Sequence, residues 1–209
     1  MDPTKNPFWR ERAPLVLASK SAGRRLVLEQ AGLPFVAVPA DVDERVIEGA
    51  VLASGGDADA VVTALACAKA KVLSAVRPGA LVLGADQAAS CESRLFGKPS
   101  DRAVAAQQLR FLSGKTHRLH SGFALARDGA VVAQGVGHAD LLMRAFSDAF
   151  LEAYLDAMGE DVTTSAGAYK IEGFGALLFE RVAGDHWTIL GLPLMDVLAA
   201  LRRIGAVAE

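Results

Sequence analysis

The chain has 209 residues, of which 52% are hydrophobic, so it is long enough to bury a sizeable core in one or two compact lobes. Its 22 basic and 24 acidic residues leave a net charge of −2, which argues against general binding of nucleic acid through a basic surface. The sequence contains neither a run of about 18 apolar residues nor the apolar segment of a signal peptide. We therefore expect no membrane anchor and a cytoplasmic location.

The N-terminal residues 1–13 are polar and contain prolines, which predicts a flexible extension before a folded domain over residues 14–207. Cys67 and Cys91 lie outside any CxxC spacing. This spacing favours reduced thiols over a zinc site or a disulfide.

From residue 15 onward, short apolar runs typical of strands alternate with helical patterns, which predicts a single α/β domain of two lobes. The predicted strands cover residues 15–18, 35–38, 80–85, 117–126, 131–142 and 176–182. The predicted helices are one that follows Ser21 and others over residues 57–75, 101–112, 147–154 and 193–204. An acidic loop is expected after the second strand, and Asp128-Gly129 predicts a hairpin turn.

The stretch LVLASKSAGRRLVLEQAG, residues 15–32, suggests an anion site where the first strand meets the first helix. With Ser21 as the N-cap, unpaired backbone N–H groups at the helix start favour a phosphate or carboxylate. Arg24 and Arg25 add permanent positive charge and forked donors suited to phosphate oxygens. The alternative is a capped surface helix with solvated arginines.

Two acidic residues, Glu44 and Asp86, each follow a predicted strand, where α/β folds place ligands. Carboxylate oxygens suit Mg²⁺ or Mn²⁺, and one of the two carboxylates could also deprotonate a water. The alternative is that Glu44 belongs to a solvated loop and that Asp86 caps a turn.

Further polar residues lie on predicted loops and on one helix. Lys98, held in the tight loop LFGKP, could act as a point charge on a phosphate, and Lys69 on its helix is a weaker candidate. Glu172, close to Gly173 and Gly175, could accept hydrogen bonds from a base that carries N–H donors. Surface lysines and a structural bend are the alternatives.

The four histidines show no ligand spacing. His117 and His120 are three residues apart, so in a strand they point to opposite faces. We expect His117, His120, His138 and His186 to be structural or surface residues.

Taken in order, several blocks of the chain resemble the Maf-like nucleoside triphosphate pyrophosphatases. The matching blocks run from Leu15 to Leu194 and are LVLASKSAGRR with LEQAGLPF, PADVDE, ACAKA, LGADQ, FGKP, LSGKTH, the SG of HSGFAL, and AGAYKIEGFGALLFERVAGDHWTILGLPL. The resemblance implies an α/β fold of the Maf/ITPase-like kind, in which a mixed sheet flanked by helices forms two lobes around a central cleft. It also implies hydrolysis of a nucleoside triphosphate to a monophosphate and pyrophosphate with a divalent metal.

The family's functional positions carry over to matching residues of this chain. Asp86 matches the catalytic acid that accepts a proton, and Glu44 matches a carboxylate for which metal binding is the natural role, with Asp86 as a second metal ligand. The resemblance places five polar and basic residues around the triphosphate: Ser19, Arg24, Arg25, Lys69 and Lys98. A homodimer is a family-level expectation.

Substrate choice within the family depends on a few positions. Gln87 and Glu172 resemble the DQ and EGFG motifs of the 7-methyl-GTP branch, whereas the dTTP/UTP branch carries ADT and IQG. However, Ala22 replaces the family's usual proline, and Gly23 stands where the 7-methyl-GTP branch tends to have a tryptophan. We predict 7-methyl-GTP or another modified nucleotide as substrate. A dTTP/UTP-type enzyme is one alternative, and a nucleotide-binding protein that restrains septum formation without turnover is another.

Overall fold

The computed structural model describes residues 6–92 and 94–209, so the first five residues of the predicted extension lie outside the described part. The chain divides into two compact units. Unit 1 comprises Met1–Asp86, Ser121–Gly137 and His186–Glu209, and unit 2 comprises Gln87–His120 and His138–Asp185.

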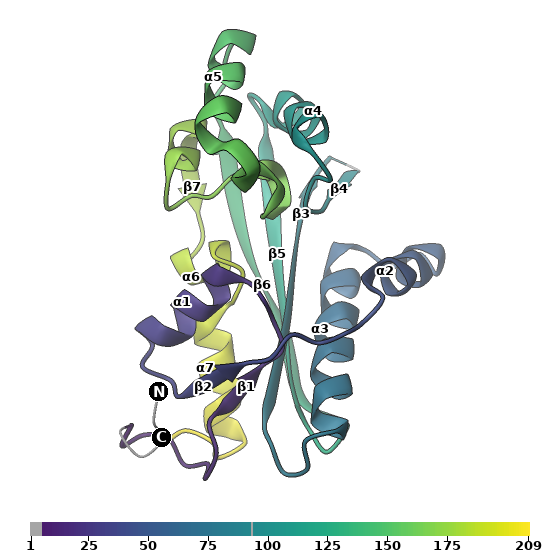
Figure 1. Ribbon diagram of the computed structural model, residues 1–209, viewed down its shortest axis with the longest axis vertical. Coiled ribbons are helices and arrows are strands. Elements are labelled where there is room, and N and C mark those ends of the chain that lie inside the picture. Colours follow the sequence, from purple (N-terminus) through teal and green to yellow (C-terminus); the bar gives the residue numbers. More distant parts are fainter. Residues whose placement is uncertain (1–5, 93) are drawn as a thin grey trace. The chain divides into compact units, whose positions relative to one another are not determined.

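A mixed seven-stranded sheet confirms the expected α/β fold (Figure 1). The strand order is β2-β1-β3-β5-β6-β7, and β4 pairs with β3. β1 is parallel to β2 and β3, whereas the β3–β4 and β6–β7 pairs are antiparallel. The strands are β1 (Leu15–Leu17), β2 (Phe35–Ala37), β3 (Val82–Cys91), β4 (Arg94–Phe96), β5 (Thr116–Arg127), β6 (Ala130–Met143) and β7 (Phe179–Ala183).

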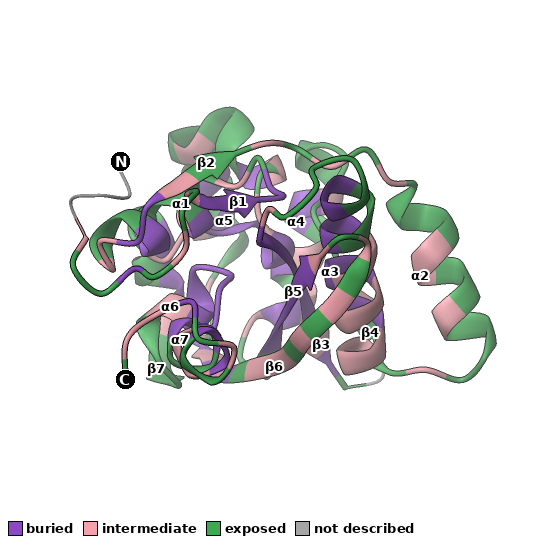
Figure 2. Cartoon of the chain, turned by 90° about the horizontal axis from the view of Figure 1, so that it is seen from below, coloured by how far each residue is buried: buried purple, intermediate pink, exposed green. Residues whose placement is uncertain are grey.

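In unit 1, helices cover both faces of the strands. α3 (Ala58–Ala75) lies on one face, and α1 (Ala22–Gln30) and α7 (Leu194–Arg203) lie on the other (Figures 1 and 2). Small side chains dominate the core beneath α3, which includes Ala66, Ala70, Ala124 and Ala126 with Val16 and Val82. Because alanines project so little, the helix axis comes close to the sheet.

Residues 6–13, for which the composition predicts a flexible extension, instead contact the rest of unit 1. Trp9 is buried and forms an isolated antiparallel bridge with Val207. The Asn6 side chain donates to the carbonyl of Gly32, and Glu11 pairs with Arg127 at 2.6 Å. The N-terminal segment is thus joined to the C-terminal one.

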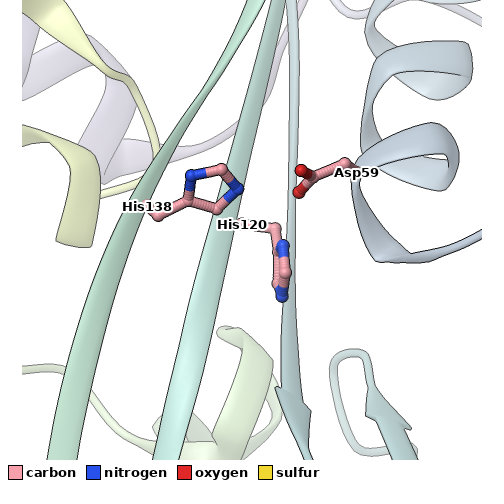
Figure 3. Close-up of side chains that lie close together, drawn as sticks. All are labelled: Asp59, His120 and His138. Carbon is pink, nitrogen blue, oxygen red and sulfur yellow. The ribbon is translucent and has the colours of Figure 1, made fainter.

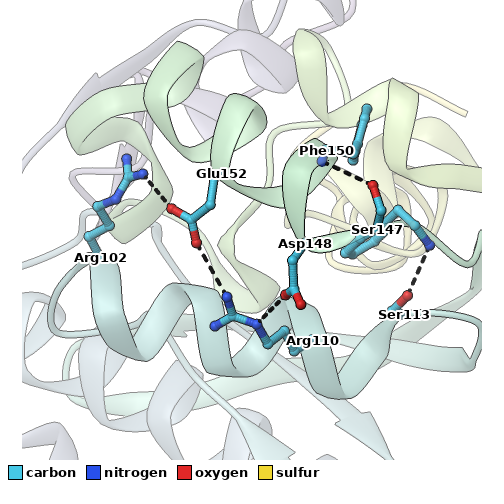
Figure 4. A network of polar contacts seen from close by, with 8 residues as sticks. Arg102, Arg110, Ser113, Ser147, Asp148, Phe150 and Glu152 are labelled. Atoms are coloured by element: carbon cyan, nitrogen blue, oxygen red, sulfur yellow. Dashed lines mark hydrogen bonds and ion pairs between the residues drawn. The ribbon is translucent and has the colours of Figure 1, made fainter.

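In unit 2, α4 (Arg102–Leu112) packs against α5 (Asp148–Met158), and charged side chains link the two helices (Figure 4). Glu152 accepts hydrogen bonds from Arg102 at 3.0 Å and from Arg110 at 3.3 Å, and Arg110 also pairs with Asp148. Such exposed pairs contribute little stability individually. Both helices also bury leucines, among them Leu109 on α4 and Leu155 on α5.

Three predicted elements were wrong in detail. The expected acidic loop covers residues 38–43 but ends at Glu44, where α2 (Glu44–Ala53) begins. The strand predicted over 80–85 continues to Cys91, and the last strand begins at Phe179, after a 3-10 turn (Phe174–Leu178). Short elements were missed as well, namely β4 and α6 (His186–Ile189). Among the described residues, no helix is long and apolar enough to cross a membrane.

His117 on β5 is a structural residue of unit 2, as predicted. It is buried, its Nε2 lies 2.6 Å from the hydroxyl of Tyr169, and its ring also contacts Phe179. Burial lowers the pKa of His117 to about 4, although the nearby charge of Asp140 opposes the shift. The imidazole is therefore neutral at pH 7.

This burial predicts acid sensitivity. The unfolded chain binds a proton at His117 near pH 6.5, but the folded chain does so only near pH 4, so stability is lost as the pH falls through this window. For His117 alone, we expect the free energy of unfolding to be about 2 kcal/mol lower at pH 5 than at pH 7. Urea titrations at both pH values should show this difference in the wild type and in His186→Gln, an exposed control, but not in His117→Gln. An unchanged pH dependence in His117→Gln would contradict the assignment.

Candidate active site

The turn from β1 into α1 is built as the sequence predicts. Ser21 is the N-cap of α1, and its hydroxyl accepts a hydrogen bond from the backbone N–H of Arg24. The hydroxyl of Ser19 accepts from the backbone N–H of Ser21 at 3.2 Å and from an N–H of the Arg24 guanidinium at 3.0 Å. The turn thus presents a helix start, which favours anions, beside a fixed cation.

The two arginines of this turn differ in their surroundings. Arg25 is exposed, whereas Arg24 is buried and donates from Nε to the carbonyl of Gly191 at 2.9 Å. Burial lowers the pKa of Arg24, while the negative charges of Asp86 and Glu44 raise it. A guanidinium stays charged even so, and the two carboxylates stabilise that charge.

Gly23 has no room for a side chain. A Cβ added there would lie 2.7 Å from the carbonyl oxygen of Leu190. The start of α1 therefore packs directly against the backbone that follows α6. The structure gives a packing reason for the glycine, independent of the specificity role that the family resemblance suggests.

Glu44, Lys69 and Asp86 converge in unit 1. The Lys69 ammonium lies 2.7 Å from Asp86 and 2.8 Å from Glu44. The Lys69 and Asp86 side chains are only 8% and 13% exposed, whereas the Glu44 side chain is 55% exposed. The two acidic residues proposed from sequence therefore share the Lys69 ammonium, and Arg24 is close enough for both carboxylates to raise its pKa.

The position of Lys69 depends on two glycines of the sheet beneath α3. A Cβ on Gly84 of β3 would lie 2.7 Å from the backbone nitrogen of Ala70, and one on Gly122 of β5 would lie 2.8 Å from the carbonyl oxygen of Val62. Only glycine permits this approach. Because Asp86 follows Gly84 by two residues on the same strand, the approach brings Lys69 to it.

The donor set fits a divalent metal. Two carboxylates that face one cation provide the hard oxygen ligands that Mg²⁺ or Mn²⁺ prefers. A bound triphosphate would supply further oxygens. Glu44 and Asp86 are thus the residues that would hold the ion.

Three other predicted site residues belong to unit 2. Gln87 lies on β3 and is half-buried, Lys98 is exposed on the loop after β4, and Glu172 is exposed on the turn before the 3-10 helix. All three remain candidates for binding the substrate.

His120 and His138 lie side by side on neighbouring strands of unit 2 (Figure 3). Their ring centroids are 5.3 Å apart, with the planes nearly perpendicular. The Nε2 of His120 lies 2.7 Å from the hydroxyl of Ser90. His120 is buried and His138 is exposed.

A family model described as "Maf-like protein" matches residues 14–204. The chain belongs to the Maf-like family.

Relatives of this Maf-like protein carry two names. A protein of Bradyrhizobium diazoefficiens, named nucleoside triphosphate pyrophosphatase, is 52% identical over 93% of this chain and 96% of its own length. One of Nitrobacter hamburgensis with the same name is 48% identical over 96% and 98%. One of Rhizobium etli, named 7-methyl-GTP pyrophosphatase, is 48% identical over 92% and 97%.

Sequence reasoning missed the helical setting of Glu44. Glu44 is the first residue of α2, whose N-cap is Asp43, which accepts from the backbone N–H of Val46 at 3.1 Å. An aspartate cap followed by apolar residues at Ile47 and Val51 is the signal that could have revealed the helix. The Glu44 carboxylate therefore extends from the first turn of a capped helix and not from a loop.

The Gly84 contact can be tested by a single methyl group. We expect Gly84→Ala to lower the free energy of unfolding by about 3 kcal/mol, because the methyl group forces α3 away from β3. Gly49 lies inside α2 with nothing within 4 Å of an added Cβ, so Gly49→Ala is the matched control. It should stabilise the protein by about 0.5 kcal/mol through helix propensity. Urea unfolding measures both, and equal stability of the two variants would refute the close approach.

Proposed function

We propose that this Maf-like protein hydrolyses a nucleoside triphosphate to a nucleoside monophosphate and pyrophosphate, with 7-methyl-GTP or another modified nucleotide as its substrate. The protein is an enzyme of the nucleoside triphosphate pyrophosphatase type, in keeping with relatives 48–52% identical over most of its length. The observation that carries the residue assignments is the shared pairing of Lys69 with Asp86 and Glu44, near the buried Arg24.

In this proposal the turn from β1 into α1 binds the phosphates. The backbone N–H groups at the start of α1 favour negative charge, and the Arg24 guanidinium is held in place by Ser19 and Gly191. Arg25 is exposed at the same helix start and adds a second guanidinium. Lys98 adds a further point charge on the polyphosphate.

Asp86 would accept the proton of the attacking water. The water oxygen forms a bond to the α-phosphorus as the bond from that phosphorus to the oxygen bridging it to the β-phosphorus breaks, and pyrophosphate leaves with the bridging oxygen. Lys69 keeps the Asp86 carboxylate oriented through the 2.7 Å hydrogen bond. Charge that develops on the phosphate oxygens is offset by the arginines and lysines.

A divalent ion held by Glu44 and Asp86 would supply Lewis-acid stabilisation of the phosphate charge. The balance of charges among the residues of the site supports a need for such an ion. Arg24 and Lys69 balance Glu44 and Asp86 one for one, so the charge of a triphosphate needs further cations.

Glu172 and Gln87 support a purine with N–H donors as the substrate base. A carboxylate accepts hydrogen bonds, and guanine offers donors at N1 and at its amino group. Glu172 is exposed and so accessible to a ligand. One relative named 7-methyl-GTP pyrophosphatase agrees with this preference.

Replacing Asp86 tests the catalytic assignment. We expect Asp86→Asn to lower the rate of pyrophosphate release by about 100-fold or more, because the amide cannot accept the water proton. Asp156→Asn, which changes an exposed carboxylate on α5, is the control and should retain full activity. Near-normal turnover by folded Asp86→Asn protein would refute the role.

A substrate panel tests the base preference. We expect kcat/KM to be highest for 7-methyl-GTP among 7-methyl-GTP, GTP, UTP and dTTP, measured with Mg²⁺ and with Mn²⁺. Glu172→Gln should lower kcat/KM for the two guanine nucleotides by about tenfold, because the charged acceptor is lost, while leaving that for UTP unchanged. A preference for UTP in the wild-type protein would favour the dTTP/UTP-type alternative.

A further inference from the structure

The SG motif of β5 lies within unit 1, and the proposed reaction gives it no role. Gly122 faces α3, whereas Ser121 points to the opposite face of the sheet, toward Thr188 of α6. Ser121 is fully buried, and its hydroxyl donates to the carbonyl oxygen of Thr188 at 2.7 Å. A buried hydroxyl with such a short bond anchors the backbone that accepts from it.

That carbonyl belongs to α6, whose end leads directly into a turn at residues 190–191. The Thr188 carbonyl oxygen also accepts from the backbone N–H of Gly191 at 3.0 Å, which closes the turn. The turn rests on β6 as well, because a Cβ added to Gly137 would lie 3.1 Å from the Thr188 hydroxyl. Residues 188–191 are therefore fixed against the sheet from two neighbouring strands.

The other end of the turn holds Arg24. The Gly191 carbonyl accepts the Nε–H of Arg24 at 2.9 Å, and the carbonyl of Leu190 lies against Gly23. The guanidinium is thereby held on one edge by Gly191 and at one of its terminal nitrogens by Ser19. Its remaining N–H groups are those that can bind an anion.

We propose that Ser121 is a positioning residue that acts through the Thr188–Gly191 turn to orient Arg24 toward a phosphate of the substrate. The inference rests on the proposed function, because it assigns Arg24 to the triphosphate. Ser121 itself touches no reacting atom. Loss of its hydroxyl removes the anchor of the turn on β5 and leaves the Gly191 carbonyl free to move with the guanidinium.

A purely structural serine would behave differently from a positioning one. If Ser121 only stabilises the fold, its loss weakens ligand binding equally whether or not Arg24 is present. If Ser121 acts through Arg24, its loss has no further effect once the arginine is gone. A double-mutant cycle separates the two cases.

The cycle measures, by calorimetry and in the presence of Mg²⁺, the affinity for the non-hydrolysable α,β-methylene analogues of GTP and UTP, with Asp86 and Glu44 left intact. We expect Ser121→Ala to weaken binding of the tighter ligand by about tenfold when Arg24 is present and by less than about twofold in Arg24→Ala. Ser74→Ala is the matched control. Ser74 is an equally buried serine of unit 1, whose hydroxyl donates to the Lys71 carbonyl, and its loss should have the same small effect in both backgrounds.

A second measurement needs no ligand. Hydrogen exchange of the Arg24 Nε–H, followed by NMR, should be roughly tenfold faster in Ser121→Ala than in the wild type, and unchanged in Ser121→Thr and Ser74→Ala. Ser121→Cys preserves volume and replaces Ser121→Ala should the latter not fold. Unchanged exchange, additive losses in the cycle, or failure to bind either nucleotide would overturn the inference. Absence of pyrophosphate release from every nucleotide, with a non-additive cycle and faster exchange, would refute the proposed function alone.

Discussion

The direct contact between α3 and two glycines of the sheet is the constraint on which the site in unit 1 depends. With a side chain on Gly84 or Gly122, the helix would have to move away, and Lys69 would move with it. The alanine-rich face of α3 serves the same end, since it keeps the core beneath the helix thin. The ion pairs of Lys69 with Asp86 and Glu44 are therefore a result of backbone packing rather than of the charged side chains alone.

Arg24, the other cation of the site, is held by a residue near the C-terminal end of the chain. Arg24 is held by Gly191, a residue 167 positions further along the sequence, and by Ser19 in its own turn. Desolvation of a guanidinium is unfavourable unless its N–H groups are bonded and its charge is balanced. The carboxylates of Asp86 and Glu44 provide that balance, so Arg24 and the two carboxylates stabilise each other electrostatically.

Local signals in the sequence predicted much of this arrangement, and long-range contacts explain the remainder. The apolar run at residues 15–18, the Ser21 cap and the helix over 57–75 were recoverable because each depends on neighbouring residues. The polar segment before Glu44 is the loop that its composition predicts, whereas the helix that begins at Glu44 was missed although Asp43 caps it. No local pattern could reveal that Lys69 contacts both acidic residues or that Gly23 meets Leu190, because these partners are distant in sequence.

The contact between Gly23 and Leu190 makes the side chain at position 23 and the path of the backbone after α6 depend on each other. A homologous protein with a larger residue at the position of Gly23 must carry a displaced turn after α6, since backbone atoms occupy the space that the side chain needs. The same turn supplies the Gly191 carbonyl that holds Arg24. Sequence changes at these two segments are therefore expected to arise together, and a residue transplanted between relatives at position 23 alone would disturb the arginine as well.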